Sequence, residues 1–241
     1  KTGMLTRAAV QAARAVLLQD LLREKTTGQK YDAPTDIWAM PIKNYPIGDG
    51  FLTAQIQDET GKFNLNDLAS ATGGDIEQKK KILRAKRLFE LLRVSPNLVD
   101  TLIDWIDQDE VPQPAGAESL YYQSLRPPYR AANSPLPGMG DLRLIKGFTL
   151  EIIERLSPYV TVFPQEGGVP MNLNTADPIV IQTLDPSVTQ TMAIEIVQGR
   201  PYKTKVDLDR VSSFQEIGRT LRNDYDIKSD YFSARLAVTV N

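Results

Sequence analysis

The sequence predicts an α+β fold in which a block of helices interrupts one small sheet. Three observations predict it: residues 3–25 follow a helical pattern, strand patterns occupy residues 38–58 and 230–240, and short helices and loops fill the long stretch between them. We therefore predict three segments. Residues 1–63 begin the body with a helix and strands, residues 64–200 form an inserted α-helical domain, and residues 201–241 return to the body with a C-terminal strand.

The first element is predicted from apolar residues at three- and four-residue steps, which form one stripe on a helix. The stripe consists of Ala8, Ala12, Ala15, Leu18 and Leu22, widened by Leu17 and Leu21. Small alanines suit close packing against a flat surface. The run Thr26-Thr27-Gly28 is expected to end this helix.

The strands are predicted from alternation of apolar and polar residues. A Gly48-Asp49-Gly50 turn separates two apolar runs, and the second run, residues 51–58, alternates Leu52, Ala54 and Ile56 with polar neighbours. Near the end of the chain, alternation over residues 230–240 places one set of residues on a single face: Phe232, Ala234, Leu236, Val238 and Val240.

Between these strands, the pattern predicts helices over residues 82–92 and 98–106, two short helices around a Lys146-Gly147 corner, and a last helical pair after residue 174. Such short pairs resemble helix-hairpin-helix or SAM-like bundles. The triplet Asn-Leu-Asn occurs at residues 64–66 and again at 172–174. We predict that Leu65 and Leu173 are buried while the flanking asparagines satisfy backbone groups at each turn.

Composition excludes several classes of chemistry. The chain has 241 residues, a formal net charge of −2, and neither cysteine nor histidine. It therefore lacks disulfides, thiolate chemistry and the commonest general base, and any bound metal must take hard oxygen ligands, which favours calcium or magnesium over zinc. We find no apolar run long enough to span a bilayer and no signal peptide. Because the chain opens on Lys1, we expect a processed or trimmed protein.

An acidic loop is the strongest chemical candidate. Asp107, Asp109 and Glu118 occupy relative positions one, three and twelve of a calcium loop, but Pro112 stands where an EF-hand requires glycine. An EF-hand is therefore rejected, and two alternatives stay open: a solvated acidic helix end, or a loop with converging oxygens. A glycosidase pair is a further alternative. It is disfavoured because the nearby aromatic residues are expected to pack the loop: Tyr121, Tyr122 and Tyr129.

A basic run at residues 79–87 raises nucleic-acid binding as the alternative function. However, residues 64–200 contain 13 Lys plus Arg and 17 Asp plus Glu, a net of −4. This balance favours a solvated helix face over a phosphate-binding surface.

Several phrases, in order along the chain, resemble one known family. They are QDETGKFNLN at residues 57–66, DWIDQDE at 104–110, GAESLYY at 116–122, PPYRAANSPL at 127–136, DLRLIKGFT at 141–149 and NLNTA at 172–176. Together they resemble the K-type minor pseudopilins of type II secretion. The resemblance implies a pseudopilin fold, in which a long N-terminal helix packs on a small antiparallel sheet that carries a large all-α insert.

The resemblance also implies a non-catalytic role in the periplasm of a Gram-negative bacterium, at the tip of the secretion pseudopilus. Its expected partners are the I-type and J-type minor pseudopilins in a ternary complex, with secreted substrates as further candidates and no nucleic acid. Family members begin with a leader and an inner-membrane anchor, which we expect this chain to have lost. Packing of N-terminal helices suggests three partner-facing residues: Leu5, Val16 and Leu17.

Calcium is implied by the same resemblance. We expect a structural Ca²⁺ held by Asp107, Asp109 and Glu118, with Asp104 and Asn133 as further candidate ligands. Such an ion would join a helix end to the segment that leads into Tyr121 and Tyr122.

Overall fold

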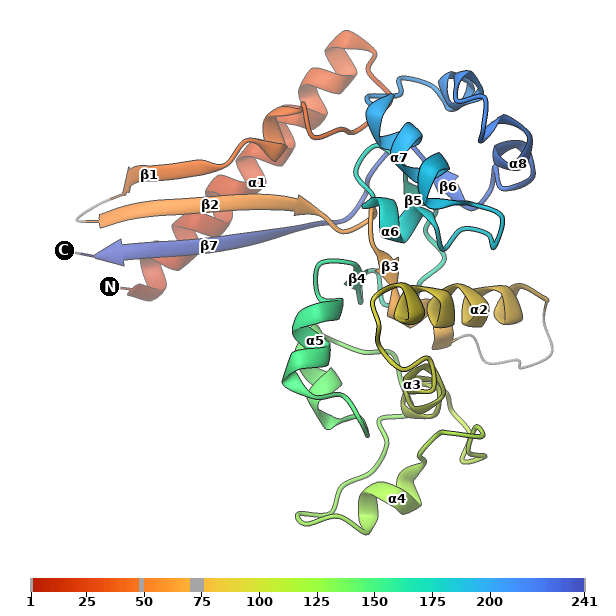
Figure 1. Cartoon of the computed structure of the whole chain (residues 1–241). Helices are drawn as coiled ribbons and strands as arrows, with labels where there is room; N and C mark the ends of the chain where they lie inside the picture. The colour runs from red at the N-terminus through yellow and green to blue at the C-terminus, as the bar shows by residue number, and fades with distance from the viewer. Residues whose placement is uncertain (1, 48–49, 70–75, 241) are drawn as a thin grey trace. The chain divides into compact units, whose positions relative to one another are not determined.

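A computed structural model describes residues 2–47, 50–69 and 76–240 (Figure 1). The chain divides into two compact units. The first, here called the body, contains Lys1–Gly61, Pro170–Ala176 and Ile194–Asn241. The second, the insert unit, contains Lys62–Val169 and Asp177–Ala193.

This division differs from the predicted insert at two places, because residues 170–176 and 194–200 group with the body. Hydrogen bonds explain the grouping. The side chain of Asn172 donates to Asp32 O at 3.2 Å, and Arg200 Nε donates to Leu173 O at 2.6 Å. Helical character alone could not reveal these attachments to the body.

The body's sheet has three antiparallel strands in the order β1-β2-β7, with β1 at Ile42–Ile47, β2 at Gly50–Asp58 and β7 at Phe232–Val240. Strand β2 pairs with β7 over its whole length, from Gly50 opposite Val240 to Asp58 opposite Phe232. The predicted hairpin and C-terminal strand are therefore confirmed. The turn residues Gly48 and Asp49 lie outside the described residues.

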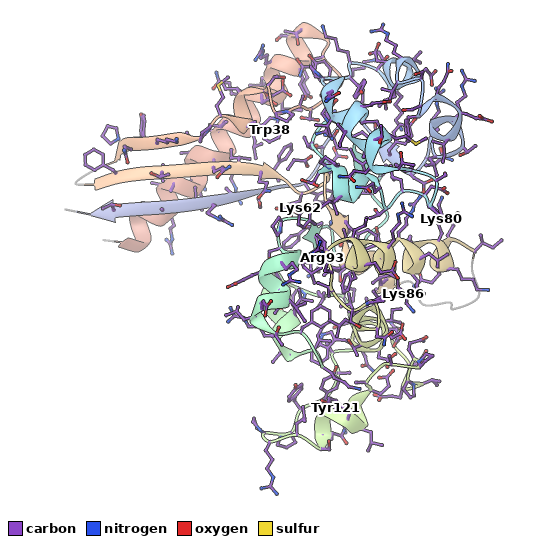
Figure 2. The ribbon with its side chains drawn as sticks, in the orientation of Figure 1. Trp38, Lys62, Lys80, Lys86, Arg93 and Tyr121 are labelled. Carbon is purple, nitrogen blue, oxygen red and sulfur yellow. The ribbon has the colours of Figure 1, made fainter. Side chains whose placement is uncertain are left out.

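Helix α1, at Thr2–Thr27, covers one face of this sheet (Figure 1). The alternation in β2 supplies the apolar face, with Leu52, Ala54 and Ile56 buried. Ala9 packs with Leu52 and Ala54, and Ala13 packs with Trp38 and Ile56. Trp38 (labelled in Figure 2) also contacts the ring of Phe232 edge-on, with centroids 5.0 Å apart.

The predicted stripe of α1 is rotated away from the buried face, so that only Ala12 and Leu17 of its members pack on the core. Among its members, Ala8, Ala15, Leu18, Leu21 and Leu22 are exposed, whereas the buried positions are Ala9, Ala13, Asp20 and Glu24. The two stripes are about one residue, or 100°, apart around the helix. Ala9 and Ala13 let the helix backbone approach the sheet, and Leu18, Leu21 and Leu22 turn outward.

The remaining body elements are short. They are η1 at Ile37–Ala39, β5 at Met171–Asn172, η4 at Lys205–Arg210, α8 at Gln215–Thr220 and β6 at Tyr225–Asp226, while α7 at Gln190–Gln198 spans the division between the units. Strands β5 and β6 pair in parallel.

The insert unit is mainly helical. Its elements are β3 at Phe63–Asn64, η2 at Leu65–Ala69, α2 at Ile76–Leu91, α3 at Leu98–Ile106, α4 at Ser119–Gln123, η3 at Met139–Leu144, α5 at Leu150–Leu156, β4 at Val160–Thr161 and α6 at Pro178–Ile181. The predicted helices over 82–92 and 98–106 are confirmed as α2 and α3. The predicted corner is confirmed by Gly147, whose φ of +84° favours glycine.

Both Asn-Leu-Asn triplets follow the same local plan. Leu65 and Leu173 are fully buried, as predicted. In each triplet the first asparagine accepts the amide of the second, with Asn64 Oδ1 bonding Asn66 N at 3.0 Å and Asn172 Oδ1 bonding Asn174 N at 2.8 Å. These are Asx turns, which release the chain from a strand.

The second asparagine of each triplet binds both backbone groups of one distant residue. Asn66 accepts from Leu136 N at 2.7 Å and donates to Leu136 O at 3.0 Å. Asn174 likewise accepts from Tyr202 N at 2.8 Å and donates to Tyr202 O at 2.9 Å. Each triplet also begins at a two-residue parallel strand pair, β3·β4 or β5·β6. The sequence pattern indicates no strands in residues 64–200, because two residues are too few for a periodic signal.

Candidate metal centre

The candidate centre lies where α3 ends and a loop leads to α4. Every residue of α3 from Val99 to Ile106 is buried, including Asp100 and Asp104. Asp107 is the C-cap residue of α3, and Glu118 is the N-cap residue of α4. Two helix ends therefore bring together acids that are eleven positions apart in the sequence.

Asp104 organises the loop. Its two carboxylate oxygens accept Gln113 N at 3.0 and 3.2 Å, and Ala117 N also bonds this carboxylate. Gly116 lies so close that an added Cβ would fall 1.8 Å from Asp104 Oδ2. Burial raises the pKa of Asp104, and these amide hydrogen bonds oppose the rise. The loop is thus wrapped around a buried carboxylate.

Asp104, Asp107 and Glu118 each offer one oxygen within 4.8 Å of the others. Burial and, to a smaller extent, the neighbouring charges of Asp104 and Asp107 together raise the pKa of Glu118 to about 8. Burial also raises the pKa of Asp107 to about 6, with Asp109 and Asp104 adding to the shift. The three acids repel one another, and a bound cation would relieve this repulsion.

Unused oxygens make this cluster suitable for a metal. Both carboxylate oxygens of Glu118, one oxygen of Asp107 and the side-chain oxygen of Asn133 are buried without a hydrogen-bond partner. Buried polar atoms are rarely left unpaired, so such a group calls for an explanation. The set consists of hard oxygens, which fits Ca²⁺ and its flexible shell of about six to eight ligands.

The five predicted ligand residues are not equivalent in the structure. Asp104, Asp107 and Glu118 come together, and Asn133 presents a free oxygen from a backbone with φ of +44°. Asp109 is exposed, and its Oδ1 accepts Val111 N at 2.8 Å. Its carboxylate therefore caps the turn of the loop.

One residue with a role here was missed. Glu110 accepts Ser119 N at 3.2 Å and Ser119 Oγ at 2.9 Å, and it also accepts Asn133 Nδ2 at 3.2 Å. It therefore ties the start of α4 and Asn133 to the loop. The sequence shows Glu110 only as one acid in a run, and nothing in its spacing distinguishes it from its neighbours.

An aromatic cluster supports the centre from the side of α4. Tyr122 is fully buried, with its ring 5.0 Å from that of Trp105 and 5.2 Å from that of Tyr129. Tyr121, labelled in Figure 2, lies beneath Lys146 Nζ at 4.9 Å. The tyrosines pack the loop, as predicted.

Comparisons with known proteins agree with one another. A family profile described as type II secretion system (T2SS), protein K, matches residues 61–165. The type II secretion system protein K of Aeromonas hydrophila is 31% identical across 100% of this chain and 80% of that protein. The chain belongs to the type II secretion system protein K family. The protein K of Pseudomonas aeruginosa is also similar, with 34% identity over 68% of this chain and 50% of that protein.

A solved structure shows that the whole fold is shared. This chain superposes with a TM-score of 0.81 on a chain from the crystal structure of the GspK-GspI-GspJ complex of the enterotoxigenic Escherichia coli type 2 secretion system. The match covers 99% of this chain and 85% of that one at 22% identity. The pseudopilin fold class expected from sequence is thereby confirmed. No helix among the described residues is long and apolar enough to cross a membrane.

Basic side chains of residues 79–87 bind other parts of the insert unit. Arg84 Nε donates to Leu184 O at 2.9 Å, and Arg87 donates to Pro186 O and Val188 O. Lys86 (labelled in Figure 2) forms a 2.8 Å ion pair with Asp100. These side chains hold α2 to nearby segments of the insert unit, and nothing in the comparisons supports the nucleic-acid alternative.

The predicted partner-facing residues lie in different surroundings. Val16 and Leu17 pack on the cluster of Ala13, Trp38 and Ile56, so they contribute to the body's own core. Leu5 belongs to α1, but its side chain lies outside the described part of the structure. The apolar surface that α1 exposes carries other residues, including Leu18 and Leu21.

A second group of acids lies in the body and was not predicted. Asp20, Asp32 and Asp36 are buried, and each offers one oxygen within 4.8 Å of the others. Backbone amides use all three carboxylates: Ile37 bonds Asp20, Ser229 N bonds Asp32 at 2.8 Å, and Ala33 N bonds Asp36 at 2.7 Å. This group therefore fixes the loop that follows α1.

Proposed function

We propose that the chain acts as a non-catalytic minor pseudopilin, exposed to the periplasm, at the tip of a type II secretion pseudopilus. The observation that carries the proposal is the fold, which is shared over 99% of the chain with a subunit of the GspK-GspI-GspJ complex. Family membership supports the same role. The partners would be I-type and J-type minor pseudopilins in a ternary complex.

The insert unit supports a terminal position by its bulk. A second compact unit is inserted into the body, and any further subunit stacked on this one would have to accommodate its volume. The test is assembly: purified I-type and J-type domains from the same bacterium should co-elute with this chain at a 1:1:1 ratio. Separate elution of the three folded proteins at micromolar concentration would contradict the proposal.

We also propose that the insert unit holds a structural Ca²⁺. The carboxylates of Asp107 and Glu118 would bind the ion, and Asn133 would supply its side-chain amide oxygen. Asp104 would lie next to these ligands. The ion would neutralise buried carboxylates and join the end of α3 to the start of α4. It would supply no reaction chemistry, because its role is to cross-link the loop.

Isothermal titration calorimetry tests this site directly. Calcium should bind the wild-type chain, and Glu118→Gln should remove that binding while leaving the fold intact, because glutamine has the same shape without the charge. Glu154→Gln, a change at an exposed glutamate on α5, is the matched control and should bind calcium as wild type does. Equal binding by wild type and Glu118→Gln would place the ion elsewhere.

A further inference from the structure

The body carries a groove beside the C-terminal half of α1. The groove is formed by one face of α1 and by residues 228–232, and it encloses about 340 Å³. Its α1 wall runs from Leu17 to Glu24, a rise of about 10 Å or two helical turns. A groove two helical turns long can be contacted by side chains from successive turns of a second helix.

The floor of the groove is acidic and poorly neutralised. Asp20, Glu24 and Asp32 line it with exposed fractions of 5%, 7% and 3%. Asp20 and Asp32 accept backbone hydrogen bonds. The Glu24 carboxylate instead meets Lys228 Nζ at 3.8 Å, beyond hydrogen-bond distance, and the Lys228 side chain is 46% exposed.

The rim of the groove is apolar. Leu18 and Leu21 line it and are 56% and 43% exposed. They lie three residues apart, and Glu24 follows Leu21 after three more, so each residue neighbours the next on the surface of α1. An apolar rim above buried carboxylates complements a side chain with a long apolar stem and a cationic end, which describes arginine and lysine.

We propose that this acidic groove receives an arginine or lysine from an amphipathic helix of a neighbouring pseudopilin. The cation pairs with Glu24 and Asp20 at the floor, and an apolar residue one helical turn away covers Leu18 and Leu21. Pairing gives the Glu24 carboxylate a partner at hydrogen-bond distance, whereas Lys228 in the described part of the body lies at 3.8 Å. The inference rests on the proposed function, because it assumes assembly with pseudopilin partners.

The test measures affinity for purified I-type and J-type domains from the same bacterium. Glu24→Gln and Leu21→Ser should each weaken binding of one partner about tenfold or more, since truncating a buried charge pair or a central apolar contact has effects of this size. Leu22→Ser changes another exposed leucine of α1, which lies outside the groove, and Glu154→Gln removes an exposed charge from the insert unit. Both controls should bind like wild type.

Charge reversal identifies the occupant. Glu24→Lys should abolish binding, and reversing one arginine or lysine of the partner helix to glutamate should restore it. If wild type forms the complex while Glu24→Gln and Leu21→Ser bind equally well, the groove proposal is wrong and the proposed function stands. If wild type binds neither domain, the proposed function itself fails. Calcium binding lost in Glu24→Gln would also overturn the proposal, because the groove would then be a metal site.

Discussion

The described part of the chain contains two groups of three acids with neighbouring carboxylates, one group in each unit, and the groups differ in what their oxygens do. In the body, backbone amides occupy Asp20, Asp32 and Asp36. In the insert unit, both oxygens of Glu118 and one of Asp107 have no hydrogen-bond partner. In both groups the three acids offer oxygens within 4.8 Å of one another. Unused oxygens, more than the proximity of acids, therefore distinguish a candidate metal site from a structural hydrogen-bond network.

The largest difference between the two units is expected when one of them is unfolded by a single substitution. Leu65→Asp places a charge at a fully buried position of the insert unit and should destabilise that unit by about 3 kcal/mol or more. Calcium binding should weaken with it, because the site depends on the folded unit. Chemical denaturation followed by Trp105 fluorescence measures the effect, and a midpoint equal to that of wild type would contradict it.

The next effect is the loss of calcium stabilisation. For wild type, calcium at a hundredfold excess over Kd should stabilise the insert unit by about 2.7 kcal/mol. Glu118→Gln should lose this increment and, without calcium, should be more stable than wild type because it removes an unpaired buried carboxylate. Thermal melting with calcium tests for the lost stabilisation, and melting with chelator tests whether Glu118→Gln is more stable than wild type. A Glu118→Gln variant that still gains stability from calcium would exclude Glu118 as a ligand.

The pH dependence separates the two groups further. Burial raises the pKa of Asp20 to about 6 and that of Asp32 to about 7, above the usual 3.8. The folded body therefore binds more protons than the unfolded chain, so its stability should fall as the pH rises from about 4 to 7. The insert unit with saturating calcium should show the opposite trend up to about pH 8, because calcium binds the deprotonated Glu118. Melting curves at pH 5 and pH 8 that move together in both units would contradict this account.

The smallest effect is expected at Asp109. Its side chain is exposed and caps Val111 N, so Asp109→Ala should lower calcium affinity by less than about threefold and stability by about 0.5 kcal/mol. Calorimetry on this variant sharpens the ligand assignment. Loss of calcium binding in Asp109→Ala would show that Asp109 is a ligand, as its position in the loop sequence predicted. The loop would then have to rearrange around the ion.

The sequence predicted the elements whose periodicity is long, including β2, β7, α2 and α3. It failed where the signal was short or depended on packing. The two-residue strands at Asn64 and Asn172 have no period, and the buried face of α1 was misplaced because alanines occur on both sides of the helix. Asp107 and Glu118 could be singled out from spacing and resemblance, whereas the role of Glu110 depends on how the loop returns to Ser119.

The two tryptophans can show whether calcium stabilises the insert unit alone, because Trp38 lies in the body and Trp105 in the insert unit. In Trp38→Phe, fluorescence reports the insert unit, and in Trp105→Phe it reports the body. Denaturant unfolding of both variants, with calcium and with chelator, compares the two acid groups within one chain. We predict that calcium raises the midpoint reported by Trp105 and leaves that reported by Trp38 unchanged. Equal shifts at both tryptophans, or no shift at either, would contradict the assignment of the metal centre to Asp107 and Glu118.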